Sequence, residues 1–285
     1  MKAKPIIKWA GGKNLVLPLI AQKIEHVPDF HGTFFDVFGG GASVTLMAQT
    51  YFKKLHFNDT NKELINLYQV IRDYPEELMT LLDEHAKKHG RDYYYSIRKL
   101  DRDENYENLA PLQRAARFVY LNKTCYNGLY RVNAKGHFNV PIGRQSSLNL
   151  YDKQNILSFS KAFESVEISN SDYSPIIKIA TKGDLVYIDP PYDKIHQQSF
   201  VGYNGKVFDE FDQARLADDV HELTGKGVYV IFSNAATQRV EQLYERYLNN
   251  DSYIDVRRMI ASKPNGREIT QEILADNFRV VSDDR

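Results

Sequence analysis

Cysteine is nearly absent from this chain, because Cys125 is the single one among 285 residues. One cysteine cannot form a disulfide within the chain, and it excludes a zinc site that is built from several cysteines. Long apolar runs are also missing. None approaches the roughly 18 residues of a membrane-spanning helix, and the apolar part of MKAKPIIKWAGGK is too short for a signal peptide. We therefore expect a cytoplasmic protein that makes no contact with a membrane.

The chain has no excess of either charge, since 37 lysines and arginines are balanced by 37 acidic residues. Proteins that bind nucleic acid usually carry a basic surface, so this neutrality argues at first sight against such a partner. The charges are nevertheless unevenly distributed. The segment 108–150 has no acidic residue but contains six cations, namely Arg114, Arg117, Lys123, Arg131, Lys135 and Arg144. Aromatic residues are interleaved with them, among which are Tyr120, Tyr126, Tyr130 and Phe138. Such a mixture is typical of phosphate contact and base stacking, with a solvated basic surface as the alternative.

The apolar runs predict an α/β fold with an inserted helical block. Buried strands are predicted by the apolar runs at 34–38, 184–189 and 227–233, of which the last two have the continuous character of parallel-type strands. Further strands are predicted at 54–58, 253–260 and 272–277. Between residues 62 and 123 the apolar spacing becomes helical, and Pro75 and Pro111 suit first turns of helices. The length allows one large domain or two modest ones.

Three glycines follow the first predicted strand, and an aspartate ends the next one. The turn Phe38-Gly39-Gly40-Gly41 lets the backbone approach a nucleotide-like ligand, and the amides at the following helix start can meet its polar groups. Asp59 lies eighteen residues beyond Gly41, close to the spacing at which dinucleotide-binding folds place an acid on the ribose hydroxyls. A tight turn with an ordinary surface aspartate is the alternative.

The tetrapeptide Asp189-Pro190-Pro191-Tyr192 directly follows another predicted strand. Two prolines fix the backbone, so the Asp189 carboxylate and a main-chain carbonyl can point into one cleft and accept both hydrogens of an exocyclic amino group. Tyr192 can then stack on the face of a flipped nucleobase. No metal is required, and a stiff loop is the alternative.

The segment 8–13 (KWAGGK) places the only tryptophan beside two lysines and a glycine pair. It is not a phosphate-binding GxxxxGK[ST] loop, because Ile7 and Asn14 stand where that motif requires Gly and Ser or Thr. A ligand-binding loop and a tryptophan that packs in the core are both open.

These motifs together resemble the Dam-like DNA adenine-N6 methyltransferases, in which KWAGGK, FxGGGx, a recognition region and DPPY occur in this order across nearly the whole chain. The resemblance implies a Rossmann-like methyltransferase mixed sheet formed by residues 1–60 and 151–285, with a mainly helical DNA target-recognition domain inserted at 61–150. It also implies S-adenosylmethionine as cofactor and no metal. The residues that it assigns to the cofactor site are Trp9, Ala10, Lys13, Phe38, Gly39, Gly40, Gly41, Asp59, Asp172, Tyr173 and Asp189.

The segment 126–144 (YNGLYRVNAKGHFNVPIGR) resembles the target-reading hairpin of this family. The resemblance implies double-stranded DNA as the substrate and GATC as the site. The implied roles are a wedge into the base stack for Tyr126, contact with the separated pair or nearby backbone for Asn127, guanine reading by Lys8 and Arg131, and thymine-methyl contact by Leu129 and Pro141. Further DNA contacts fall on Asn139, Arg144, Arg257 and Arg258, with Ser262 and Lys263 near phosphates. Gln145 departs from the family pattern, in which relatives often carry Tyr.

The implied reaction is direct methyl transfer to adenine N6, whose lone pair is delocalised into the ring. Asp189 and the Pro190 carbonyl would accept its two N–H bonds, and Tyr192 would hold the flipped base. The enzyme is expected to be a monomer, with a restriction endonuclease as a potential companion. A cytosine-C5 methyltransferase is disfavoured, since its cysteine nucleophile typically follows Pro, whereas Cys125 follows Thr. An N4-cytosine or other amino-group methyltransferase and a non-catalytic DNA-binding module are the remaining alternatives.

Overall fold

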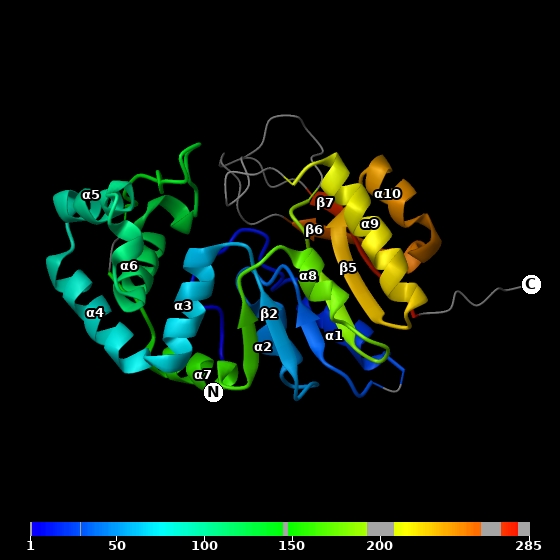
Figure 1. Ribbon diagram of the computed structural model, residues 1–285. Helices are drawn as coiled ribbons and strands as arrows, with labels where there is room; N and C mark the ends of the chain where they lie inside the picture. Colours follow the sequence, from blue (N-terminus) through cyan, green and yellow to red (C-terminus); the bar gives the residue numbers. More distant parts are fainter. Residues whose placement is uncertain (1, 29, 145–147, 193–207, 258–268, 279–285) are drawn as a thin grey trace, which may run out of the picture.

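The computed structural model describes residues 2–28, 30–144, 148–192, 208–257 and 269–278, and within them the fold is built on a seven-stranded mixed sheet (Figure 1). The bounds of the strands are β1 Phe34–Asp36, β2 Leu55–Asn58, β3 Val166–Ser169, β4 Leu185–Ile188, β5 Tyr229–Ala235, β6 Tyr253–Arg257 and β7 Ile269–Asp276. The strand order is β3-β2-β1-β4-β5-β7-β6. The strands from β3 to β5 pair in parallel, whereas β7 pairs antiparallel with both β5 and β6. This arrangement confirms the predicted mixed α/β sheet.

Helices pack on both faces of the sheet, because its central strands are apolar on both sides. The helices on the two faces are α1 Leu17–Glu25, α2 Ser43–Ala48, α8 Tyr173–Lys178, α9 Glu210–Gly225 and α10 Gln238–Tyr244. Phe34 of β1 belongs to a core shared with α1 and α2, while the next residue, Phe35, belongs to the core of α8, α9 and α10. This alternation follows from the opposite directions of successive side chains in a strand. Within the described ranges, none of the helices combines the length and apolar character of a membrane span.

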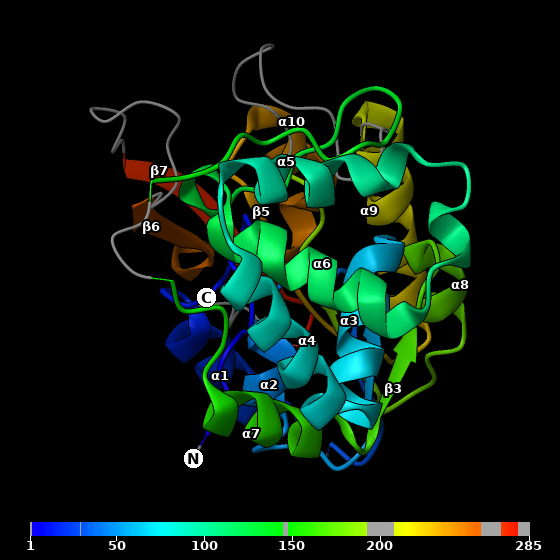
Figure 2. The same ribbon diagram turned by 90° about the vertical axis from the view of Figure 1, so that its left-hand side faces the viewer.

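Between β2 and β3 the chain forms a block of helices that lies beside the sheet (Figures 1 and 2). The block contains the helices α3 Lys62–Asp73, α4 Pro75–Lys88, α5 Arg91–Lys99, α6 Pro111–Thr124 and α7 Lys153–Phe163. It also contains the 3₁₀ turns η1 Leu100–Arg102, η2 Tyr106–Asn108 and η3 Tyr126–Gly128. Two further 3₁₀ turns, η4 Glu245–Tyr247 and η5 Asn250–Ser252, follow α10. The apolar core continues from the sheet into this block, since Phe57 of β2 contacts Tyr68 of α3 and Phe163 of α7. The division of the chain at residues 61 and 150 stays a prediction.

Most of the predicted elements are present, with shifted ends. Pro75 and Pro111 open α4 and α6, as their restricted backbone predicts. The first strand ends at Asp36, two residues early, because the chain turns there into the glycine segment. β3 was not predicted, since only Val166 of its four residues is buried and the apolar signal is short. Residues 258–260 of another predicted strand lie outside the described residues.

The connections diverge at β1, because β2 pairs on one side of it and β4 on the other. In open parallel sheets, ligands bind outside the carboxyl ends of the strands at such a point. The carboxyl ends of β1, β2 and β4 lead into the glycine turn, Asp59 and Asp189, respectively. Three of the predicted site segments therefore meet at one edge of the sheet, which we call the carboxyl edge.

A buried ion pair joins α1 to β7, since Lys23 Nζ lies 2.7 Å from Asp276 Oδ2 and the two side chains are 9% and 2% exposed. We expect Lys23→Met to lower the free energy of unfolding by about 3 to 5 kcal/mol, because it removes the cation from a buried carboxylate. Urea denaturation measures this change. Lys226→Met breaks the exposed pair with Glu222 and serves as the control, with an expected change of less than about 1 kcal/mol. Equal effects of the two substitutions would contradict the expectation.

Candidate active site

Lys13 reaches the carboxyl edge from the loop before α1. Its Nζ lies 2.9 Å from Asp189 Oδ1, and the two side chains are 7% and 15% exposed. The same ammonium donates a hydrogen bond to the Tyr192 hydroxyl and lies 4.4 Å from the centre of the Tyr192 ring. The structure thus brings together the KWAGGK segment and the Asp-Pro-Pro-Tyr motif, which are far apart in the sequence.

Two residues that the sequence did not single out complete this cluster, Ser233 of β5 and Glu272 of β7. Ser233 Oγ donates a hydrogen bond to Asp189 Oδ1 at 3.2 Å and lies 2.6 Å from the Tyr192 hydroxyl. The Tyr192 hydroxyl donates to Glu272 Oε2 at 2.8 Å. Ser233 lies opposite Leu274 in the antiparallel pair, so it is a diagonal neighbour of Glu272 on one face. The sequence signal for Glu272 was an acid directly before the apolar run of Ile273, Leu274 and Ala275.

The cluster is shielded from water, and burial shifts its titration. Burial raises the pKa of Asp189, while the Lys13 ammonium counteracts this shift. Burial, together with the negative charges of Asp189 and Glu272, holds the pKa of Tyr192 well above its usual value. The Tyr192 hydroxyl therefore stays protonated and can act as a hydrogen-bond donor.

A further carboxyl group, that of Asp36, lies behind the carboxyl edge and is 1% exposed. Thr45 Oγ1 donates a hydrogen bond to Asp36 Oδ2 at 2.6 Å, which ties the end of β1 to α2. Burial raises the pKa of Asp36 to about 7, although the Thr45 bond lowers it. This group supports the turn that follows β1 and is not presented to solvent.

The glycine turn is packed so closely that it has no room for side chains. A Cβ on Gly39 would lie 2.0 Å from the Phe57 ring. Gly40 has a φ of +47°, and a Cβ there would lie 3.0 Å from Trp9 Cδ1. Asp59 supports the turn, because its Oδ2 accepts the Gly40 N–H at 3.0 Å while its other oxygen accepts a second backbone N–H at 2.8 Å. The sequence paired Asp59 with the glycine turn by their spacing, and in the structure a direct hydrogen bond joins the two.

The other residues predicted for the cofactor site are placed differently around this turn. Phe38 directly precedes Gly39, and its ring centre is 5.2 Å from that of the buried Tyr173. Asp172 accepts a backbone N–H at the start of α8, and Arg215 Nη2 lies 3.7 Å from its carboxylate. Ala10 is exposed. Phe38, Asp59 and the glycines therefore gather at one place, whereas Asp172 is occupied as a helix cap.

The N-terminal segment connects this edge to the predicted recognition hairpin. The ring centre of Trp9 lies 5.1 Å from that of Tyr130 and 6.1 Å from that of Phe118. The Lys8 N–H donates to Asn122 Oδ1 at 2.9 Å, and Asn122 Nδ2 donates back to the Lys8 carbonyl at 2.8 Å. Trp9 is half-buried, so it packs between the glycine turn and the hairpin instead of lying within the core.

Residues 125–143 form an irregular hairpin with isolated antiparallel bridges, Cys125 with Ile142 and Val132 with Phe138. The helical block holds it by hydrogen bonds from side chains to its carbonyls at residues 138 and 140, and the donors are Tyr94, Arg98 and Arg102. The predicted DNA contacts that lie exposed on it are Tyr126, Asn127, Arg131, Pro141 and Arg144, while Leu129 and Asn139 are half-buried. Arg257 ends β6 without a described side chain, and the predictions for Gln145, Arg258, Ser262 and Lys263 lie outside the described residues.

The basic segment 108–150 is less available to DNA than its composition suggested. Arg114 Nη2 lies 2.5 Å from Glu63, and the buried Arg117 lies 2.9 Å from Asp101. Both acids lie outside the segment, so the absence of acids within it gave no information on pairing. Of Tyr120, Tyr126, Tyr130 and Phe138, Tyr126 is the exposed one. The exposed cations Arg131, Lys135 and Arg144 lie in the hairpin or directly beside it, and not along the whole segment.

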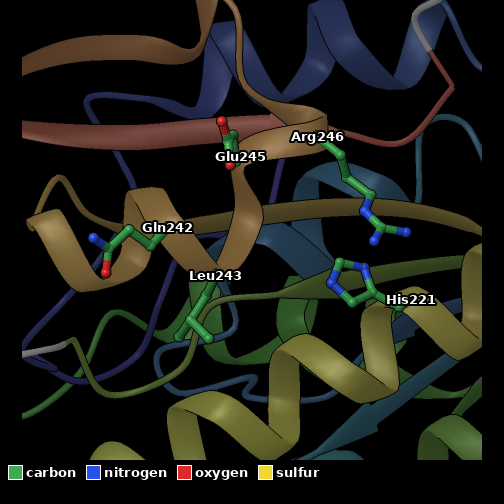
Figure 3. A pocket seen from close by; sticks show the side chains of 5 residues that line it. All are labelled: His221, Gln242, Leu243, Glu245 and Arg246. Atoms are coloured by element: carbon green, nitrogen blue, oxygen red, sulfur yellow. The ribbon is translucent and has the colours of Figure 1, made fainter.

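A surface hollow of about 440 Å³ lies away from this site, between α9, α10 and η4 (Figure 3). His221 and Arg246 face one another across it, and burial followed by the charge of Arg246 lowers the pKa of His221. Its lining residues, which are His221, Gln242, Leu243, Glu245 and Arg246, come from none of the segments at the carboxyl edge. In the part of the chain that the structure describes, no cluster of His, Cys, Asp or Glu could hold a metal ion.

The strand order and the buried cluster at the carboxyl edge define an α/β enzyme of the Rossmann-like class. The family model of D12 class N6 adenine-specific DNA methyltransferases matches residues 9–260. The chain belongs to this family. This membership confirms the predicted adenine-specific DNA methyltransferase over the cytosine-specific and non-catalytic alternatives.

Relatives match nearly the whole chain. A type II methyltransferase of Lactococcus lactis subsp. cremoris is 37% identical and covers 96% of this chain and 95% of the relative. A type II methyltransferase of Methanocaldococcus jannaschii is 35% identical, over 94% of this chain and 96% of the relative. A DNA adenine methylase of Serratia marcescens is 30% identical, over 96% and 98%.

We expect Gly39→Ala to lower the free energy of unfolding by about 1 to 3 kcal/mol, the usual effect of overpacking a filled interior. The reason is the contact of 2.0 Å that the new Cβ would make with the buried Phe57 ring. Gly90→Ala is the control, because a Cβ there meets nothing within 4 Å. Denaturation curves of both variants measure the difference, and a Gly39→Ala protein as stable as the control would show that the turn has more room than described.

Proposed function

We propose that this adenine-specific DNA methyltransferase takes its methyl group from S-adenosylmethionine and transfers it to N6 of an adenine that is flipped out of double-stranded DNA within GATC. The observation that carries this proposal is the position of the Asp189 carboxylate. It lies at the carboxyl end of β4, next to the strand that leads into the glycine turn, and in a buried cluster with Lys13 and Tyr192. Donor and acceptor would thus meet at one edge of the sheet.

The residues at this edge fit S-adenosylmethionine. The glycine turn offers a backbone surface without side chains, beside the ring of Trp9. Asp59 uses one lone pair of each carboxylate oxygen for backbone N–H groups, and the others are suited to ribose hydroxyls. When bound, S-adenosylmethionine supplies an electrophilic methyl group on a positively charged sulfonium. Phe38, Asp59 and the pair of Lys13 and Asp189 would hold it, and two carboxylates suit its positive charge.

Asp189 and the Pro190 carbonyl would accept the two N6 hydrogens of the adenine, which favours a more electron-rich nitrogen and orients its lone pair. Hydrogen bonds from buried amide side chains fix the backbone of this loop. Gln213 Nε2 donates to the Pro191 carbonyl at 3.0 Å, and Asn234 Nδ2 donates to Gln213 Oε1 at 2.9 Å. Both amides are 1% exposed. After transfer the cationic nitrogen loses one proton, and Asp189 is the carboxylate in position to take it.

Tyr192 would stack on the extruded base. Its hydroxyl is held by Lys13, Ser233 and Glu272, so the direction of its ring is set before DNA binds. Extrusion of a base costs a few kcal/mol. Stacking on Tyr192 offsets part of this cost, and Tyr126, whose side chain is 50% exposed on the hairpin, would fill the gap in the duplex.

The hairpin geometry supports recognition of GATC. Arg131 Nε donates to Asn139 Oδ1 at 2.7 Å, which orients the guanidinium. Among the described residues, no protein group bonds its two Nη atoms, and these can form the bidentate contact with guanine O6 and N7. Lys8 packs against the hairpin turn at Gly128, where its Cδ lies 2.5 Å from the position of a Cβ. Two cations are thereby available for the two guanines of the site.

Two of the relatives are type II methyltransferases, and this likeness favours a role beside a restriction endonuclease. We extend the proposal to this role and to action as a monomer. A palindromic site carries one target adenine on each strand, so a monomer would methylate the two strands in separate events.

We expect Asp189→Ala to reduce methyl incorporation into GATC duplexes more than about 100-fold, because both charge stabilisation and orientation of the amino group are lost. Labelled S-adenosylmethionine and mass spectrometry of the digested nucleosides measure the amount and identity of the product. DNA binding should remain largely intact. Asp251→Ala, at an exposed position, is the control. Full activity of Asp189→Ala, or a product other than N6-methyladenine, would refute the proposal.

We expect Arg131→Ala to relax specificity at one guanine of the site, at a cost of about 1 to 3 kcal/mol in discrimination. Methylation rates on GATC and on its one-base variants give this value for the unaltered and the substituted protein. Lys135→Ala removes another exposed cation of the hairpin and should weaken the binding of all DNA sequences alike. If the unaltered protein does not prefer GATC, the proposed site is wrong.

A further inference from the structure

Glu272 approaches the active site from β7, and its side chain is 8% exposed. Its Oε2 lies 4.0 Å from Lys13 Nζ and accepts the Tyr192 hydroxyl at 2.8 Å. Lys13 Nζ lies 2.9 Å from Asp189 on its other side. One ammonium is therefore placed between two buried carboxylates, of which one belongs to the catalytic motif and the other does not.

The number of charges in this cluster matters for the reaction. Lys13 and Asp189 alone would form a neutral pair. With Glu272, one ammonium serves two carboxylates, and the cluster retains a formal charge of −1. Methyl transfer makes the adenine amino nitrogen positive before it loses a proton, so a negative charge beside it stabilises the transition state more than the ground state. Burial strengthens this effect, because water screens the charges less.

We propose that Glu272 is a positioning residue for methyl transfer, which shares the Lys13 ammonium so that this ammonium does not fully neutralise the Asp189 carboxylate that faces the adenine amino group. This inference rests on the proposed function of Asp189. Tyr192 connects Glu272 to the ammonium, because its hydroxyl accepts a hydrogen bond from Lys13 and donates one to Glu272. Glu272 thus acts through Lys13 and Tyr192 and does not need to touch the substrate.

The other groups that face Asp189 cannot take this role. Ser233 is neutral and donates to Asp189 Oδ1. Tyr187 is neutral, since burial raises its pKa well above its usual value. Asp36 lies behind the carboxyl edge on β1, where it accepts the Thr45 hydroxyl. Among the described residues, Glu272 is the second carboxylate within 4.0 Å of Lys13 Nζ.

Glu272→Gln tests the inference, because it keeps the shape and an acceptor for Tyr192 but removes the charge. We expect the single-turnover rate at saturating DNA and S-adenosylmethionine to fall roughly 10- to 100-fold. This is less than the roughly 100- to 1000-fold loss for a group in direct contact with the transition-state charge, because Glu272 acts through Lys13. The KM values should change little. The acid limb of the rate–pH profile should move to lower pH, because the negative charge of Glu272 raises the pKa of Asp189 and its removal makes Asp189 harder to protonate.

Two further variants separate charge from packing. Glu272→Asp keeps the charge and should recover part of the rate. Ser233→Ala removes a hydrogen bond that lowers the pKa of Asp189, so its acid limb should move to higher pH. If Glu272→Gln and Ser233→Ala acted only through a general loss of packing, both would reduce the rate, but their acid limbs would not move in opposite directions. NMR titration of ¹³C-labelled Asp189 in the protein without DNA provides a readout that does not depend on activity, and Glu272→Gln should lower the pKa that it reports.

The outcomes distinguish this inference from the proposed function. Full activity of Asp189→Ala overturns the proposed function itself. Loss of activity in Asp189→Ala, together with an unchanged rate and acid limb in Glu272→Gln, overturns the role of Glu272 alone. If Glu272→Gln does not fold, as judged by circular dichroism, Glu272→Asp decides. The shorter aspartate side chain lies farther from Lys13, so Glu272→Asp should still have a lower rate than the wild-type protein and an acid limb displaced to lower pH. Wild-type values for both would contradict the inference.

Discussion

The contact of Lys13 with Asp189 and Glu272 is the constraint on which the rest of the structure depends. An ammonium and two carboxylates are largely removed from water here, and each would be costly to bury without the others. They belong to the N-terminal segment, the loop after β4 and the antiparallel strand β7. Each of these parts therefore contributes to holding the others in place. The same contact fixes Tyr192, so the requirement for stability and the requirement for a preformed active site are met by one cluster.

The segment 8–13 links specificity to chemistry. Lys8 is bonded to Asn122 below the hairpin, Trp9 packs between Tyr130 and the glycine turn, and Lys13 contacts Asp189. Six consecutive residues therefore touch the hairpin that we propose to read DNA, the turn that we propose to bind the cofactor, and the carboxylate that we propose to be catalytic. The helical block and the sheet share one continuous apolar core on this side.

The sequence predicted what local patterns can determine. The glycine turn, the acid that follows it and the Asp-Pro-Pro-Tyr loop were placed correctly relative to their strands, because strand ends and turns have local signals. β3 was missed, since only one of its residues is buried. Ser233 and Glu272 were missed for another reason. Their proximity results from the insertion of β7 between β5 and β6, and a strand's apolar pattern does not specify its neighbour. Charge composition misled in the same way, because Arg117 pairs with an acid outside its own segment.

The position of β7 in the sequence also affects the order in which the protein folds during synthesis. Lys13 precedes every strand of the sheet, whereas Glu272 belongs to the strand that is synthesised last among those described. A growing chain on the ribosome can form the parallel strands, the helical block and the hairpin before this carboxylate emerges, because domains of this size can begin to fold during synthesis. The hairpin that we propose to read DNA would therefore form before the charge balance at the Asp-Pro-Pro-Tyr loop is complete. In this order of synthesis, the ability to hold DNA would precede the ability to modify it.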